Sequence, residues 1–63
     1  MTQKELLYVE DAIGHEKSII SICENSINNI TDEELISFIE QEITKHNETK
    51  ERLLNLLEVK ANG

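Results

Sequence analysis

The sequence contains no proline, one cysteine, two glycines and only two aromatic residues among its 63 positions. A single cysteine cannot form an intramolecular disulfide, which excludes the class of small secreted proteins held together by disulfide bonds. The length allows a single domain, residues 1–63, whose own hydrophobic core is typically worth only about 3–5 kcal/mol. Chains of this size therefore often need a metal ion or a partner chain to be stable.

Basic residues are also few. Six lysines and arginines stand against thirteen acidic residues, which gives a net charge of -7. This balance offers no surface for the phosphate backbone of a nucleic acid, and an anionic membrane surface would repel the chain. No apolar run approaches the roughly 18 residues of a membrane span, and the polar residues 1–5 do not resemble a signal peptide. We therefore expect a cytoplasmic protein whose partners are neither nucleic acids nor membranes.

The apolar residues that are present recur at steps of three and four, which is the spacing of an amphipathic helix. This pattern predicts an all-α antiparallel hairpin, with a helix over about residues 3–27, a turn over about 28–31 and a helix over about 32–59. In the first half it forms two neighbouring stripes: Leu6, Val9, Ile13, Ile20, Cys23, Ile27 and Ile30, and then Tyr8, Ala12, Ile19 and Ile22.

The expected helix starts carry capping signals. Thr2 and Thr31 are each followed three residues later by a glutamate, Glu5 or Glu34, which is the pattern of a capping box. Gly14, inside the first predicted helix, costs about 1 kcal/mol relative to alanine. It indicates either a close approach between helices or simple tolerance of the glycine.

The two apolar stripes together form a face wider than one partner helix can cover. Two helices joined by a short turn must run antiparallel, and such a hairpin leaves part of each wide face exposed. Pairing two hairpins would complete a four-helix bundle. We therefore expect a homodimer, with a second copy of the chain as the main partner.

Three polar residues interrupt the apolar stripes. If the turn is centred near Asn29, Glu16 lies thirteen residues before it and Glu42 thirteen after it, so the two should face each other, with His46 one helical turn further on. These side chains could form a hydrogen-bonded or ion-paired layer that fixes the register of the bundle. Alternatively, a dimer would gather four carboxylates and two imidazoles, a set that suits iron or manganese ions.

Several sequence segments together resemble the small spore-coat proteins of clostridia, which are similar to the coat F family and its ferritin-like relatives. The resemblance covers about residues 4–57. The segments that carry it are Lys4-Glu5-Leu6, Val9-Glu10-Asp11, Glu16, Ile30-Thr31-Asp32-Glu33-Glu34-Leu35, Lys45-His46 and Leu53-Leu54-Asn55-Leu56-Leu57.

This resemblance implies a ferritin-like helical hairpin, a dimeric bundle and a spore-coat setting with other coat proteins as further partners. It matches Glu16 and His46 to the helix-one glutamate and the helix-two histidine of such proteins. The chain departs from the ferritin-like Glu-x-x-His motif, because Ile43 stands three residues before His46 and the available glutamate, Glu42, stands four before it.

No enzyme motif is present, such as a glycine-rich phosphate loop or a nucleophile at useful spacing from a base. The sequence therefore favours a non-enzymatic structural or assembly protein without a cofactor. The first alternative is a metal-binding bundle that uses Glu16, Glu42 and His46. A second is a helical regulator that docks on a signalling protein, as small sporulation phosphatases do, although the Ser-x-Glu-Leu-Asp signature of that group is absent.

Overall fold

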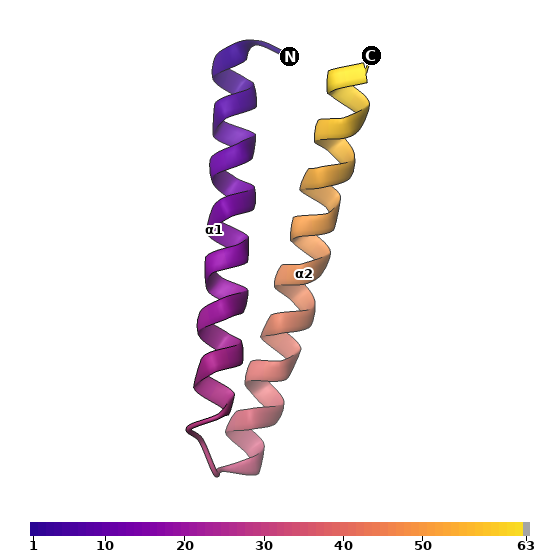
Figure 1. Cartoon of the computed structure of the whole chain (residues 1–63). Coiled ribbons are helices and arrows are strands. Elements are labelled where there is room, and N and C mark those ends of the chain that lie inside the picture. Colours follow the sequence, from indigo (N-terminus) through magenta and orange to yellow (C-terminus); the bar gives the residue numbers. More distant parts are fainter. Residues whose placement is uncertain (63) are drawn as a thin grey trace.

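The protein is a hairpin of two long antiparallel helices, as the computed structural model shows (Figure 1). The structure describes the backbone of residues 1–62 and the side chains of residues 1–60. Helix α1 spans Gln3–Ile27 and helix α2 spans Glu33–Asn62. The predicted all-α hairpin is thus confirmed. The first helix has the expected bounds, and the second begins one residue later and ends three residues later than expected.

Helix α1 begins with the predicted capping box. The Glu5 backbone N–H donates to the Thr2 hydroxyl at 3.0 Å, and the Thr2 backbone N–H donates to the Glu5 carboxylate at 2.8 Å. The Thr2 backbone N–H, followed by the Thr2 hydroxyl, lowers the pKa of Glu5 below its ordinary value. This stabilisation of the helix start is present above the ordinary pKa of glutamate, and it is lost as the pH falls through the lower, folded-state pKa.

The predicted capping box at Thr31 is wrong by one residue. Helix α2 is instead capped by Asp32, whose Oδ1 accepts the Leu35 backbone N–H at 3.1 Å. With Asp32 as the cap, the third helical position is Leu35, so Glu34 cannot complete a box. Aspartate is a stronger capping residue than threonine. With Asp32 as the cap, Glu33 and Glu34 lie in the first turn, where the helix dipole favours acids.

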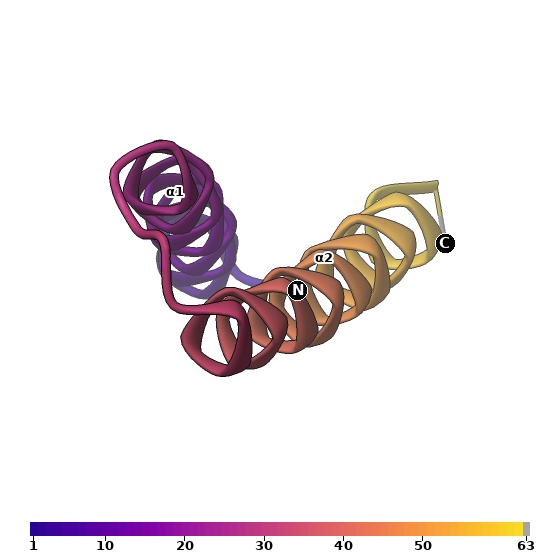
Figure 2. The same cartoon turned by 90° about the horizontal axis from the view of Figure 1, so that it is seen from below.

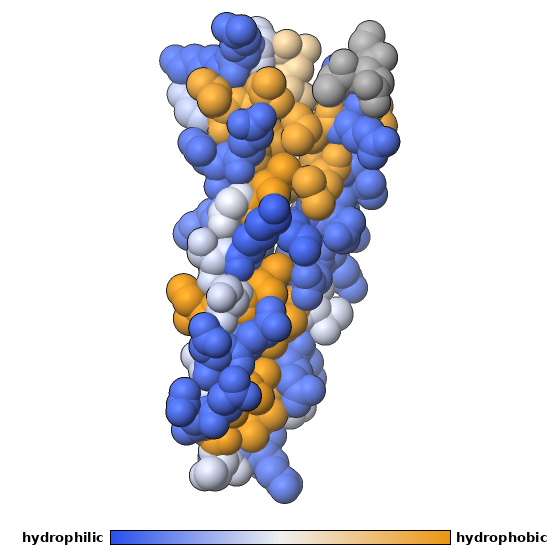
Figure 3. Space-filling model, in the orientation of Figure 1, coloured by the Kyte–Doolittle hydropathy of each residue, from blue (hydrophilic) through white to orange (hydrophobic). Residues whose placement is uncertain are grey.

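The contact between the helices is narrow. Ile13 and Ile20 are the only buried residues in the described part of the chain, with 6% and 8% of their surface exposed. Figure 3 shows apolar surface along the line between the helices, with hydrophilic surface on both sides and crossing it. The half-buried apolar residues are Leu6, Val9, Ala12, Ile19, Cys23, Ile27, Ile30, Ile36, Ile39, Ile43, Leu53, Leu54 and Leu57.

Many large apolar side chains remain exposed. Eight of them have between 45% and 67% of their surface exposed: Met1, Leu7, Tyr8, Ile22, Leu35, Phe38, Leu56 and Val59. A Cβ at Gly14 would meet no atom within 4 Å, so helix packing does not require glycine there. Neither helix, over the described residues, has an apolar stretch long enough to cross a membrane.

The hairpin is long and thin. Its Cα atoms extend over 46 × 15 × 11 Å with a radius of gyration of 14.6 Å, whereas a compact chain of this length has a radius of about 11 Å. The two helices lie close together at the turn and diverge toward the termini, which share the opposite end (Figures 1 and 2). Each helix therefore meets its neighbour along one side only.

Candidate functional site

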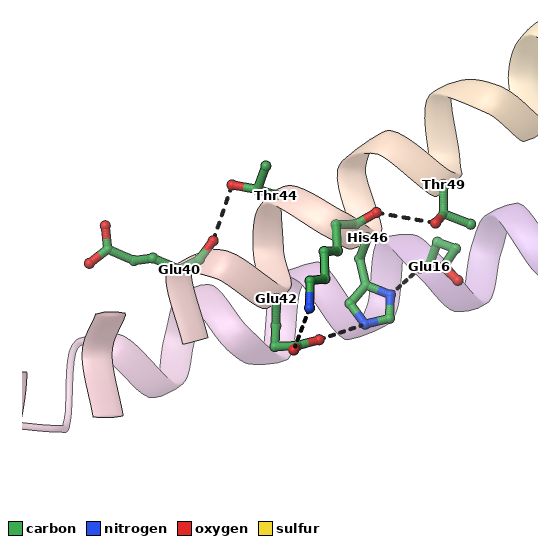
Figure 4. A network of polar contacts seen from close by, with 7 residues as sticks. Glu16, Glu40, Glu42, Thr44, His46 and Thr49 are labelled. Carbon is green, nitrogen blue, oxygen red and sulfur yellow. Dashed lines mark hydrogen bonds and ion pairs between the residues drawn. The ribbon is translucent and has the colours of Figure 1, made fainter. Parts of the chain in front are cut away.

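A polar layer crosses the hairpin near the middle of both helices. It consists of the three residues that the sequence singled out, Glu16 from α1 and Glu42 and His46 from α2 (Figure 4). Glu16 was expected to face Glu42, but it contacts His46, one helical turn further along α2. The His46 Nδ1 lies 2.5 Å from the Glu16 Oε2, and the His46 Nε2 lies 3.8 Å from the Glu42 Oε2. Helical spacing explains the second contact, since residues four apart share one face. The first contact joins the two helices.

The layer is partly desolvated. The Glu16 side chain keeps 15% of its surface exposed, and those of His46 and Glu42 each keep 29%. The Lys45 ammonium lies 3.7 Å from the Glu42 Oε1, but its side chain is 70% exposed. A solvent-exposed ion pair of this kind contributes at most about 1 kcal/mol. The Glu16–His46 contact is therefore the energetically important part of the layer.

The two carboxylates approach opposite nitrogens of one imidazole ring. The contact between Nδ1 and Glu16 is short enough for a hydrogen bond, whereas the 3.8 Å between Nε2 and Glu42 is an ion-pair distance. A metal ion, in contrast, binds the lone pair of a single ring nitrogen. An ion on either nitrogen of His46 would therefore have only one of the two carboxylates, Glu16 or Glu42, on its own side of the ring.

The structure thus brings the three predicted ligands together without forming a complete site. Over the described residues, no set of three or more histidine, cysteine, aspartate or glutamate side chains is arranged to hold a metal ion. His15 is exposed, and Cys23 is a free, half-buried thiol. The predicted metal site needs ligands from a second copy of the chain, so it stays a prediction.

Comparisons with protein-family models, curated proteins and solved structures find no match for this chain.

Sequence reasoning missed a second feature, a groove at the open end of the hairpin. The groove has a volume of about 510 Å³, is open to solvent, and is lined by Met1, Glu5, Tyr8, Val9, Leu56 and Lys60. Its walls come from both helices. The second apolar stripe, which includes Tyr8, indicated an exposed face but not a groove, because the divergence of the helices creates it.

The polar layer predicts a specific pattern of stability changes. We expect His46→Leu to lower the free energy of unfolding by about 1–3 kcal/mol, because it leaves the mostly buried Glu16 carboxylate without its partner. The double variant Glu16→Leu/His46→Leu should recover or exceed the original stability, since replacing both members of a buried pair with apolar residues is often neutral or stabilising. Urea unfolding followed by circular dichroism measures both changes.

His15→Leu is the matched control, because His15 is the other histidine and is exposed on α1. Its effect should stay within about 0.5 kcal/mol. The single variant Glu16→Leu completes the set. If the loss in the double variant equals the sum of the losses in Glu16→Leu and His46→Leu, Glu16 and His46 do not stabilise each other.

Proposed function

We propose that this chain is a non-enzymatic structural protein that assembles through a homodimeric four-helix bundle. The observation that carries the proposal is the contrast between two buried isoleucines and eight exposed large apolar side chains in the described residues. Large exposed apolar side chains that gather on one side of a protein often mark a protein–protein contact surface. A second hairpin would bury those of the eight that lie on the side it covers.

The accessible surface supports the same proposal. The chain exposes 4945 Å², whereas a folded monomer of its 7.2 kDa mass typically exposes about 4,100 Å². The excess of about 800 Å² equals the area that one partner contributes to a protein–protein interface of standard size. The elongated hairpin thus exposes enough surface for such an interface. Its own core is small, so burying this surface against a partner would add to its stability.

The proposal assigns no reaction to the chain. Among the described residues, the one imidazole–carboxylate contact between the helices is directed inward, between Glu16 and His46. The groove at the open end is lined mostly by apolar side chains, with Glu5 and Lys60 as its charged members. Glu5 is already engaged by the Thr2 backbone N–H. These features suit packing against another protein better than chemistry on a substrate.

We further propose a spore-coat setting and a ferritin-like arrangement of the dimer, on the strength of the sequence resemblance over residues 4–57. The hairpin form and the Glu16–His46 contact agree with that resemblance. Immunogold electron microscopy of sporulating cells of the source organism tests the setting. Label concentrated over the coat layers would support it, and label confined to the mother-cell cytoplasm would contradict it.

Metal binding is the second candidate function, and it is favoured by one observation: Glu16 of α1 and Glu42 of α2 both approach the imidazole of His46. In this alternative, the dimer holds iron or manganese between the layers of two chains. Plasma mass spectrometry on untagged protein reloaded with iron, manganese and zinc should then find about one or two ions per dimer. Glu16→Ala should abolish the binding.

Glu24→Ala is the control for metal binding, because Glu24 is an exposed glutamate of the same helix outside the layer. Metal retained equally by both variants would indicate adsorption to the acidic surface. No metal above background in the unmodified protein would contradict the alternative and leave the structural proposal.

A further inference from the structure

The two ends of the hairpin differ in shape. The open end carries the groove with Tyr8, Leu56 and Lys60 on its walls. At the turn end the helices lie close together (Figure 1), and a shallow surface there is formed by Asp32, Glu34, Leu35 and Phe38. Phe38 is 58% exposed and Leu35 is 45% exposed. One end is therefore narrow with exposed apolar side chains, and the other is wide with an apolar groove.

These two surfaces lie on the same face of the hairpin. Phe38 and Leu56 are eighteen residues apart on α2, which is five complete turns, so they point in the same direction. Leu56 in turn shares the groove with Tyr8 of α1. We call this face the aromatic face and define it by Tyr8, Phe38 and Leu56.

The aromatic residues are also placed symmetrically about the polar layer. Tyr8 lies eight residues before Glu16 on α1, and Phe38 lies eight residues before His46 on α2. Because the helices are antiparallel, these steps lead in opposite directions, each about 12 Å from the layer at 1.5 Å per residue. A two-fold axis through the layer would therefore bring Phe38 of one chain to the height of Tyr8 of the other.

We infer that the partner on the aromatic face is a second copy that runs antiparallel to the first and is related to it by a two-fold axis. In this arrangement, which we call head to tail, the turn end of each hairpin lies in the open-end groove of the other. The inference rests on the proposed function, because it specifies how the proposed dimer is arranged. The two-fold axis passes through the Glu16–His46 layer. Phe38 and Leu35 of one copy then pack between Tyr8 and Leu56 of the second.

Charge favours the same arrangement. The turn-end surface carries two acids, Asp32 and Glu34, whereas the groove carries one acid, Glu5, and one base, Lys60. Glu34 is twelve residues before His46 and Lys60 is fourteen after it, so a head-to-tail pair places them at heights of about 18 and 21 Å on the same side of the axis. A head-to-head pair would instead bring two acidic turn ends together, which is unfavourable for like charges.

The polar layer fixes the register of this pair. At the axis, the layers of the two copies lie at the same height, so their partly exposed groups stay near polar groups of the partner. Sliding one copy by a helical turn or more would move these groups against apolar neighbours such as Ile19 and Ile39, which is costly for polar groups removed from water. One register is therefore preferred over its neighbours.

Site-directed crosslinking tests the orientation. Two variants, Tyr8→Cys and Phe38→Cys, each also carrying Cys23→Ser, are mixed in equal amounts and treated with a short bis-maleimide reagent. Head-to-tail pairing places the two different thiols at one height and separates like thiols by roughly 24 Å along the bundle. We expect crosslinks between the two different variants to exceed crosslinks within either variant by about tenfold, as measured by mass spectrometry.

Crosslinks of each variant mainly with itself would overturn the head-to-tail inference while leaving the homodimer intact. A single-chain mass for the unmodified protein would instead contradict the proposed function itself, so the two failures are distinguishable. If loss of an aromatic side chain prevents pairing, the polar pair Glu34→Cys and Lys60→Cys is mixed in the same way. It should give the same preference for crosslinks between different variants.

Discussion

Ile20→Ala is expected to abolish most of the stability of the hairpin. Ile20 and Ile13 are the only buried residues in the described chain, and replacing a buried isoleucine with alanine typically costs 2–5 kcal/mol. A core of this size is worth only about 3–5 kcal/mol in total. The variant should therefore lose most of its helical signal in far-ultraviolet circular dichroism at 25 °C and low micromolar concentration.

Ile22→Ala is the matched control for this experiment. Ile22 lies on the same helix two residues away, but 65% of its surface is exposed. The same substitution there removes little buried surface and introduces a good helix former, so the free energy of unfolding should change by no more than about 0.5 kcal/mol. Equal losses at Ile20 and Ile22 would contradict the described packing of the helices.

Phe38→Ser is expected to dissociate the dimer with little effect on the isolated hairpin. Phe38 is 58% exposed in the single chain, so its contribution within the chain is small. In a dimer, the side chain is removed twice, and burying a phenylalanine is worth about 1.5–3 kcal/mol. Because the single hairpin already covers part of Phe38, the loss for two chains is about 2–4 kcal/mol. This loss should raise the dissociation constant by about 30- to 1,000-fold, which sedimentation equilibrium can measure.

Leu7→Ser is the control for the aromatic face. Leu7 has the same exposed fraction as Phe38, 58%, and it directly precedes Tyr8. On a helix, adjacent residues point about 100° apart, so Leu7 lies off the face that Tyr8 shares with Leu56. The dissociation constant should change less than tenfold in this variant. A larger effect at Leu7 than at Phe38 would place the interface on another face.

Much of the fold could be predicted because helical periodicity fixes the direction in which each side chain points and its height along the helix. Counting thirteen residues on each side of Asn29 placed Glu16 opposite Glu42. The structure instead pairs Glu16 with His46, one helical turn further along α2, so the count was right to within one turn. The start of α2 was predicted less well, because Thr31 and Asp32 are both good capping residues. The choice of Asp32 depends on which oxygen reaches the Leu35 backbone N–H.

Other features of the site depend on geometry that residue spacing does not encode. Spacing places Glu42 and His46 one turn apart on α2 and Glu16 close to both on α1, but side-chain rotamers decide that the carboxylates approach opposite nitrogens of the ring. Similarly, the apolar stripe that contains Tyr8 shows which face is exposed. The groove beside Tyr8 arises from the divergence of the two helices (Figure 2), which a pattern along one chain does not specify.

The mass of the unmodified protein in solution tests the homodimer most directly. Size-exclusion chromatography with multi-angle light scattering should give about 14.4 kDa, twice the chain mass of 7.2 kDa, at micromolar concentration. The mass should fall toward that of one chain on dilution, and the midpoint temperature of unfolding should fall with it, because pairing stabilises the hairpin. A mass of 7.2 kDa at all concentrations, combined with a cooperative unfolding transition, would contradict the account.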